Sequence, residues 1–351
     1  MSRNNGTRVI TLGTAGGPVW WTGPSAGTRS GISTAVVVGD RVYLIDAGSG
    51  VGRQMMLAGL PAHHLRAVFI THLHSDHVVD LASLALFGMM GLSKAGPSDP
   101  VQIHGPGDRM VLPPVSPAAK IDPRPLFPEN PTPGIANVFQ TLMRAHATDL
   151  NDRILDSLRP TPFEYFKATD IAIPASVGFH ANDRPTPEMA PFLVYEDEAV
   201  RVTATLVEHP PIAPAFAFRF DTDDGSVVIS GDTTETLNTV KISEGADLLL
   251  HEAIDFNWVE ELYGGRTDDV GRAMREHHYK SHSSPRGALE IAESANVKHL
   301  ALHHLVPGTT PLDVWYRERG SYRGTFTVPS DLEVIPIGRQ RTVISHLSRA
   351  D

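Results

Sequence analysis

The sequence carries a dense cluster of metal-binding side chains near residue 75. Residues 71–77 read Thr-His-Leu-His-Ser-Asp-His, so three imidazoles and one carboxylate fall within six residues. Imidazole and carboxylate groups are common ligands of zinc, manganese and iron. Burying so many polar groups is costly unless something binds them. We therefore predict that His72, His74, Asp76 and His77 ligate metal.

Three further candidate ligands lie downstream, each at the end of an apolar stretch that is typical of a buried strand. They are His209, Asp232 and His304. Together with the first four, they complete two coordination shells. Asp232 can bridge two cations because a carboxylate has two oxygens. His209 and His304 would each complete the coordination shell of one cation. The sequence predicts two divalent metal ions per chain, with zinc as the first choice and manganese or iron as alternatives.

The elements that position these residues alternate between strands and helices. Apolar and β-branched stretches predict the strands, and apolar spacing near 3.6 residues predicts the helices. This alternation is typical of an α/β architecture. The predicted strands cover residues 8–13, 34–38, 41–45, 65–71, 101–104, 200–207, 215–220, 227–230, 248–250 and 300–302, and the predicted helices cover 54–57, 80–90, 135–158 and 283–295.

Residues 112–191 interrupt the alternation. Eight prolines between residues 113 and 133 exclude a helix or a central strand in that stretch. We interpret residues 1–351 as a single domain and residues 112–191 as an insertion that serves as a lid or a dimerisation element. The alternative is that residues 112–191 form a surface segment without a function.

The composition is that of a soluble globular protein, with 41% hydrophobic and 20% charged residues. The absence of cysteine excludes disulfides, thiolate ligands and cysteine nucleophiles. We find no signal-peptide core and no long apolar run, so we expect a cytoplasmic protein without membrane contact.

The order of the motifs resembles that of the metallo-β-lactamase superfamily, in which an aspartate after a strand precedes HxHxDH, His, Asp and His. Asp46 matches the first of these positions. The resemblance implies an αβ/βα four-layer sandwich, with two mixed sheets face to face and helices outside. It also places Asp46, with Thr71, behind the ligands, where Asp46 would hydrogen-bond a ligand imidazole and fix its tautomer.

More narrowly, the chain resembles the tRNase Z-like branch of this superfamily. Residues 251–253 resemble its HEA motif, and residues 282–284 resemble its His-Ser-Thr motif. This resemblance implies that Glu252 and His282 relay a proton to the leaving oxygen, while Asp76 orients or deprotonates the nucleophile. It also implies a homodimer.

These features together predict a dinuclear metal-dependent hydrolase that uses a metal-bridging hydroxide. The formal net charge is −10, and residues 110–190 hold seven basic and nine acidic side chains. A tRNA-binding arm needs basic groups that neutralise phosphates. We therefore expect a small-molecule phosphodiester, ester or lactone as substrate, that is, a phosphodiesterase or lactonase, with nucleic acid as an unlikely partner.

Two other functions are alternatives. A tRNA 3′-end processing endonuclease (tRNase Z) is favoured by the two motifs at Glu252 and His282. A di-iron redox protein on the same fold is less favoured, because such relatives usually place a glutamate where His74 stands. The remaining candidates for a substrate pocket, for which core packing or a surface position is the alternative, are Trp20, Trp21, His180 and His278.

Overall fold

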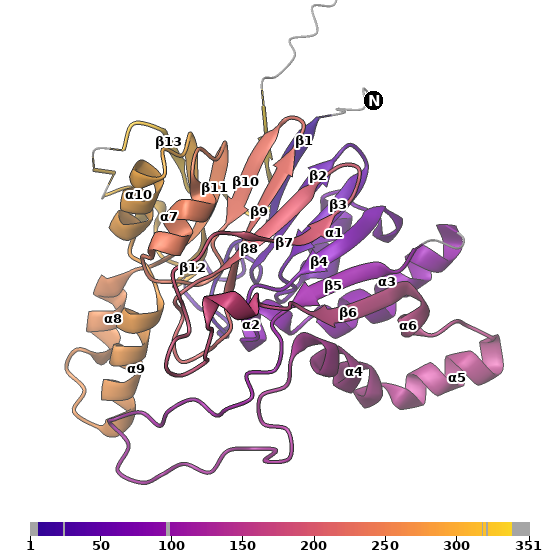
Figure 1. Cartoon of the computed structure of the whole chain (residues 1–351), viewed down its shortest axis with the longest axis horizontal. Coiled ribbons are helices and arrows are strands. Elements are labelled where there is room, and N and C mark those ends of the chain that lie inside the picture. Colours follow the sequence, from indigo (N-terminus) through magenta and orange to yellow (C-terminus); the bar gives the residue numbers. More distant parts are fainter. Residues whose placement is uncertain (1–5, 24, 96–98, 318, 321, 339–351) are drawn as a thin grey trace, which may run out of the picture.

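Two seven-stranded sheets form the centre of the computed structural model, which describes residues 6–23, 25–95, 99–317, 319–320 and 322–338 (Figure 1). The first sheet has the strand order β14-β1-β2-β3-β4-β5-β6, and the second has the order β13-β12-β11-β10-β9-β8-β7. The first sheet contains β1 (Thr7–Gly13), β2 (Ser33–Val38), β3 (Arg41–Ile45), β4 (Leu65–Phe69), β5 (Val101–Gly105), β6 (Phe166–Asp170) and β14 (Glu333–Pro336). The second contains β7 (Phe192–Glu196), β8 (Arg201–Leu206), β9 (Phe216–Thr222), β10 (Gly225–Ile229), β11 (Leu248–Ile254), β12 (His299–Val306) and β13 (Thr325–Thr327).

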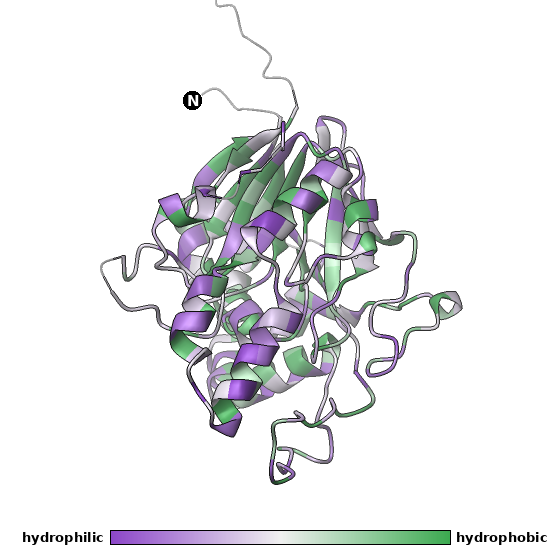
Figure 2. Cartoon of the chain, turned by 90° about the vertical axis from the view of Figure 1, so that its left-hand side faces the viewer, coloured by the Kyte–Doolittle hydropathy of each residue, from purple (hydrophilic) through white to green (hydrophobic). Residues whose placement is uncertain are grey.

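Helices cover the outer faces of both sheets. Helices α1, α3 and α4 pack on the first sheet, and α7 and α10 pack on the second. On the side that Figure 2 shows, the helices present hydrophilic residues outward while the strands behind them are largely hydrophobic. None of the helices in the described part of the chain is both long and apolar enough to cross a membrane. The helices are α1 (Val51–Leu57), α2 (Ser75–Val78), α3 (Leu81–Ala95), α4 (Ile135–Ala145), α5 (Ala147–Ser157), α6 (Pro162–Tyr165), α7 (Leu237–Ser243), α8 (Phe256–Tyr263), α9 (Asp269–Ser281), α10 (Pro285–Ser294) and α11 (Leu312–Tyr316), with 3₁₀ turns at Ala62–His64 and Ala175–Val177.

Aromatic side chains fill the space between the two sheets. Phe69 from the first sheet contacts Phe218 and Phe220 from the second, with ring centroids 5.5 and 5.2 Å apart. All three side chains are fully buried. Separate apolar clusters lie between each sheet and its helices. The predicted four-layer α/β sandwich is confirmed.

The topology brings the ends of several strands to one edge of the sandwich. β3 runs parallel to β4 in the first sheet, and β10, β11 and β12 run parallel in the second. β8 and β10 are both antiparallel to β9 and therefore share a direction. Because parallel strands end at the same edge, the loops that follow β3, β4, β8 and β10 meet there.

The inserted segment is partly built into the sandwich. β6 pairs with β5 in parallel and extends the first sheet. The single helix predicted over residues 135–158 is wrong, because His146 leaves the helical region (φ −103°, ψ 20°) and separates α4 from α5. Residues 106–134 form a long loop that reaches α9, where Lys120 Nζ lies 3.1 Å from Asp269 Oδ1 (Figure 1). A role as lid or dimerisation element stays a prediction.

We expect Phe218→Ala to destabilise the protein by about 3–5 kcal/mol, because it leaves a cavity between the sheets where no side chain can move in freely. Phe87→Ala is the matched control, since that ring is 74% exposed on α3 and should change stability by less than about 0.5 kcal/mol. Urea unfolding midpoints measure both effects. Equal stability of the two variants would contradict this account of the core.

Candidate metal centre

The loop between β4 and α2 gathers the first set of metal-binding atoms. His72 Nε2 lies 3.0 Å from His74 Nδ1, and His209 Nε2 lies 3.1 Å from the same atom. His209 comes from the loop after β8, in the other sheet. Asp232 Oδ2 approaches this set, at 3.8 Å from His72 Nε2 and 3.7 Å from His209 Nε2.

A second set of metal-binding atoms lies beside the first. His77 Nε2 is 3.2 Å from His304 Nε2, and His304 Nε2 is 3.3 Å from Asp76 Oδ2. Asp232 joins this set too, with Oδ1 3.4 Å from His77 Nε2 and Oδ2 3.2 Å from His304 Nε2. The structure thus brings all seven predicted ligands together, with Asp232 between the two sets.

The arrangement fits divalent cations. Ligand atoms about 2.0–2.1 Å from a tetrahedral zinc ion lie about 3.3 Å from one another, close to the separations seen within each set. Among the described residues, Asp232 Oδ1 is buried and has no hydrogen-bond partner. Such an atom is costly unless a ligand satisfies it. The donor set is therefore that of a divalent metal site.

The charge balance of the site also favours cations. Burial, followed by the nearby His77, lowers the pKa of His72 well below its ordinary value, and burial likewise lowers that of His209. Both rings are therefore neutral, the form that binds metal. Burial alone would lower the pKa of His77, but the carboxylates of Asp232, Asp46 and Asp76 outweigh it and raise the pKa well above normal. The negative charge around His77 is thus large enough to favour a proton on this buried ring. A metal cation beside the ring would take the place of that proton.

Asp46, expected from the motif order to hydrogen-bond a ligand imidazole, contacts His77 directly and reaches His72 through Thr71. His77 Nδ1–H donates to Asp46 Oδ2 at 2.8 Å, so Nε2 faces the site. Thr71 donates both its backbone N–H and its hydroxyl to Asp46, at 2.8 and 2.9 Å, and Thr71 Oγ1 lies 3.1 Å from His72 Nδ1. His209 is held separately, because its Nδ1–H donates to the Ser281 carbonyl at 2.7 Å.

His304 depends on a glycine that sequence reasoning missed. His304 has a positive φ of 48°, which turns its ring toward Asp76 and His77. A Cβ on Gly16 would lie 2.4 Å from two atoms of that ring, so the position has room only for glycine. The Gly16-Gly17 pair marks a turn in the sequence, but nothing in the sequence indicates that the turn lies against His304.

Glu252 and His282 form a buried pair next to the ligands. His282 Nδ1–H donates to Glu252 Oε1 at 3.0 Å, and the backbone N–H of Thr233 donates to the same oxygen at 2.9 Å. Burial alone would lower the pKa of His282, but the Glu252 carboxylate, with Asp232 and Asp76, raises it to about 8. His282 Nδ1 lies 4.0 Å from Asp232 Oδ2, so the ring is also within reach of a metal ion.

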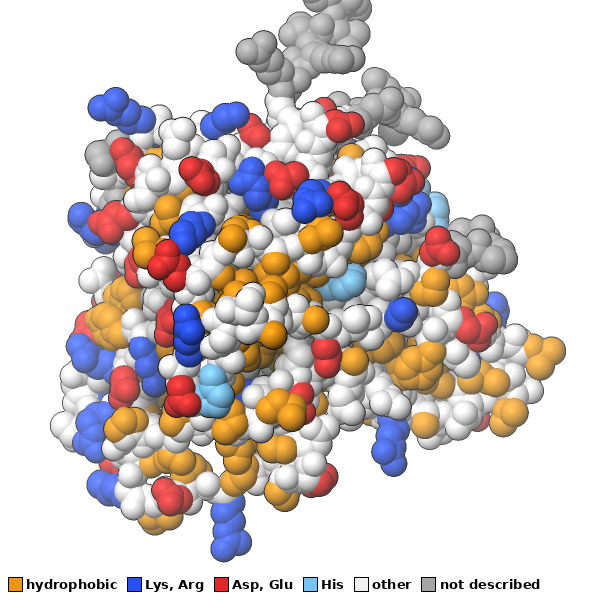
Figure 3. All heavy atoms as spheres, viewed as in Figure 1, with side chains coloured by type: hydrophobic (Ala, Val, Ile, Leu, Met, Phe, Trp, Pro, Cys, Tyr) orange, Lys and Arg blue, Asp and Glu red, His pale blue; other side chains and the backbone are white. Residues whose placement is uncertain are grey.

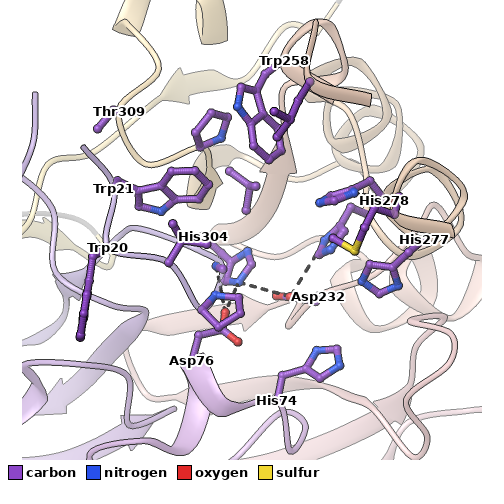
Figure 4. Close-up of a pocket in the computed structure, with 18 of the residues that line it drawn as sticks. Trp20, Trp21, His74, Asp76, Asp232, Trp258, His277, His278, His304 and Thr309 are labelled. Atoms are coloured by element: carbon purple, nitrogen blue, oxygen red, sulfur yellow. Dashed lines mark hydrogen bonds and ion pairs between the residues drawn. The ribbon is translucent and has the colours of Figure 1, made fainter. Parts of the chain in front are cut away.

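A cavity of about 590 Å³ opens onto these residues (Figure 4). Of the four pocket candidates, Trp20, Trp21 and His278 line it. His180 does not: it is exposed on the inserted segment, with Nδ1 3.0 Å from Asp183 Oδ2, and it lines a separate cavity beside Arg109. The lining residues on α8 and α9 that sequence reasoning missed are Trp258, Leu262, Tyr263 and Met274.

Comparison with known proteins identifies relatives over most of the chain. A sequence model described as the metallo-beta-lactamase superfamily matches residues 27–134. A ribonuclease Z from Mycobacterium sp. strain KMS is 30% identical over 303 residues, which are 86% of this chain and 85% of the relative. A ribonuclease Z from Mycobacterium bovis BCG Pasteur is 28% identical over 81% of this chain and 82% of its own length.

A solved structure has a similar fold. The short form of human tRNase Z aligns with a TM-score of 0.60 and 21% identity, and the alignment covers 95% of this chain and 100% of that chain.

The ribonuclease Z relatives show that our prediction of a small-molecule substrate, with nucleic acid as an unlikely partner, was wrong. That prediction depended on formal charge summed along the chain, and such a sum does not locate the surface potential. Figure 3 shows basic and acidic side chains interspersed on one face, and the figure displays no separate acidic region there. Metal ions are often the largest local charges in a site, and the sum omits them.

We expect Gly16→Ala to reduce the metal content from two ions to one per chain, because the new Cβ displaces the His304 ring while the set at His72, His74 and His209 stays intact. Gly52→Ala is the matched control, since a Cβ there meets nothing within 4 Å. Elemental analysis after dialysis measures the stoichiometry. Two ions per chain in Gly16→Ala would refute the steric argument.

Proposed function

Because this chain belongs to the metallo-β-lactamase superfamily, in its tRNase Z-like branch of metal-dependent hydrolases, we propose that it is an endonuclease that processes the 3′ end of precursor tRNA. The observation that carries the proposal is the presence of a buried Glu252–His282 pair directly beside the complete ligand set. The match of ribonuclease Z relatives to 86% of the chain supports the choice of substrate.

We propose zinc as the metal, at two ions per chain. Five of the seven candidate ligands are imidazoles, and the other two are carboxylates. Zinc binds this mixture in four-coordinate sites, whereas magnesium and calcium prefer oxygen ligands. Manganese and iron accept the same groups and are the alternatives. When bound, the cations would polarise the phosphoryl oxygens and lower the pKa of water.

The protein's own groups provide orientation and proton transfer. Asp76 Oδ2 accepts the backbone N–H of Gly17 at 2.9 Å, which holds the carboxylate at the pocket floor, where it orients the attacking water. His282 donates its Nε2 proton to the oxygen that leaves the phosphorus. Glu252 keeps the Nδ1–H of that ring in place and favours its protonated form.

We expect the purified protein to cut a precursor tRNA transcript at the junction between the acceptor end and the 3′ trailer. A chelator should abolish cleavage, and added Zn²⁺ should restore it. Asp232→Ala protein, purified in the same way, should be inactive because both ligand sets lose a member, which excludes a contaminating nuclease. An intact transcript in the presence of zinc would count against the proposal.

We expect His282→Ala to lower the turnover number by about 10²–10⁴-fold, the usual contribution of a general acid, with metal content near normal. His299→Ala on β12 is the control, because that ring bonds the Thr327 hydroxyl at 2.8 Å and does not line the pocket. Single-turnover cleavage and elemental analysis give the two values. Loss of metal from His282→Ala would instead make His282 a ligand.

A further inference from the structure

A wall of aromatic rings stands beside the metal ligands and has no part in the chemistry described so far. It consists of Trp21, Trp258, Tyr263 and His278. Trp258 is at the centre, with ring centroids 5.7 Å from Trp21, 6.4 Å from Tyr263 and 5.6 Å from His278, and near-perpendicular ring planes. Figure 4 shows Trp21 and Trp258 on one side of His304.

The rings of this wall are held in place but remain partly exposed. Trp21 Nε1–H donates to the Gly16 carbonyl at 2.9 Å. Trp258 and Tyr263 belong to α8, which packs against α9, and the stacked pair Phe256–Tyr279, with centroids 4.4 Å apart, joins the two helices. Trp21, Trp258 and Tyr263 are only partly buried, and all line the cavity of about 590 Å³. Rigid aromatic faces that water can reach are typical of a stacking platform.

His278 adds a polar group to the wall. Its Nδ1–H donates to the Met274 carbonyl at 2.6 Å, and burial lowers the pKa of the ring, which is therefore neutral. In a neutral imidazole with Nδ1 protonated, Nε2 is a hydrogen-bond acceptor. His278 lines the cavity, and its side chain is 8% exposed. Such an acceptor fits the N–H groups on the edge of a nucleobase.

We propose that this wall binds the nucleobase of the nucleotide that carries the leaving oxygen. The proposal rests on the proposed function, in which His282 protonates that oxygen. His278 lies one helical turn before His282, with ring centroids 6.3 Å apart, so the wall is on the side of the pocket where the leaving group departs. A base attached to the same sugar as the leaving oxygen would lie against Trp258. The wall then positions the scissile phosphate and sets the preference for the nucleotide at that position.

A pair of substrates tests the proposal. Analysis of the product ends first identifies the nucleotide that carries the leaving oxygen. One transcript is then made abasic at this nucleotide, and a second is made abasic on the other side of the scissile bond. For the wild-type protein, kcat/KM should fall about 5- to 150-fold on the first transcript and little on the second, as expected for loss of one stacked base.

Trp258→Ala should lower kcat/KM on the intact transcript by a similar factor and should no longer distinguish it from the first abasic transcript. Trp258→Phe should retain most of the wild-type discrimination. Val270→Ala is the matched control, because that side chain lies on α9, is 62% exposed and does not line the pocket. Binding of the product RNA, measured by fluorescence anisotropy, should show the same pattern, and all variants should keep wild-type metal content.

Three results would overturn the proposal. If Trp258→Ala loses as much activity on the abasic transcript as on the intact one, the ring has only a structural role. If the wild-type protein cleaves both abasic transcripts as well as the intact one, the endonuclease function stands and the stacking proposal fails. If the wild-type protein cleaves no RNA, the proposed function fails, and this inference fails with it.

Discussion

The whole architecture depends on keeping five imidazoles and two carboxylates together at the floor of a pocket, where five of the seven side chains are buried and His74 and Asp76 are partly exposed. Removing these groups from water is costly, and their mutual contacts at about 3 Å do not satisfy every lone pair. Divalent cations would supply the missing partners. The fold must therefore hold seven side chains from distant parts of the sequence at fixed positions before any cation binds, because misplaced ligands lose affinity.

The sandwich meets this requirement by ending strands of both sheets at a common edge. Regular strand geometry does not orient every ligand toward the site. Local departures from ideal backbone angles provide the remaining orientations. Asp46 and His304 both have positive φ, of 59° and 48°, a conformation that is uncommon for residues other than glycine. Such strain persists only where the surroundings impose it. Here the hydrogen bonds of Asp46 to Thr71 and His77 impose it on one side of the site.

The sequence could indicate that the seven candidate ligands lie together, because they come at or near strand ends in a fixed order and their residue types suit metal binding. Their role as ligands stays a prediction. The motif order also suggested that Asp46 hydrogen-bonds a ligand imidazole, and in the structure Asp46 Oδ2 accepts the Nδ1–H of His77. The sequence could not predict that Trp258 and Tyr263 face the ligands, because their position depends on how α8 and α9 pack, and no strand boundary marks it. His180 was selected on residue type and its place in the inserted segment, and the structure places it on the surface, outside the pocket. The prediction of the substrate was wrong because a formal charge summed along the sequence does not say where the charged side chains lie on the folded surface.

Metal binding in this protein would also join the two halves of the chain. The set at His72 and His74 takes His209 from the second sheet, and the set at Asp76 and His77 takes His304 from the same sheet. Each bound cation would therefore act as a cross-link between sheets, and binding to the folded state alone would shift the unfolding equilibrium by mass action. The abundance of the protein in a cell, through its resistance to proteolysis, should thus follow the supply of the metal even where catalysis is not required.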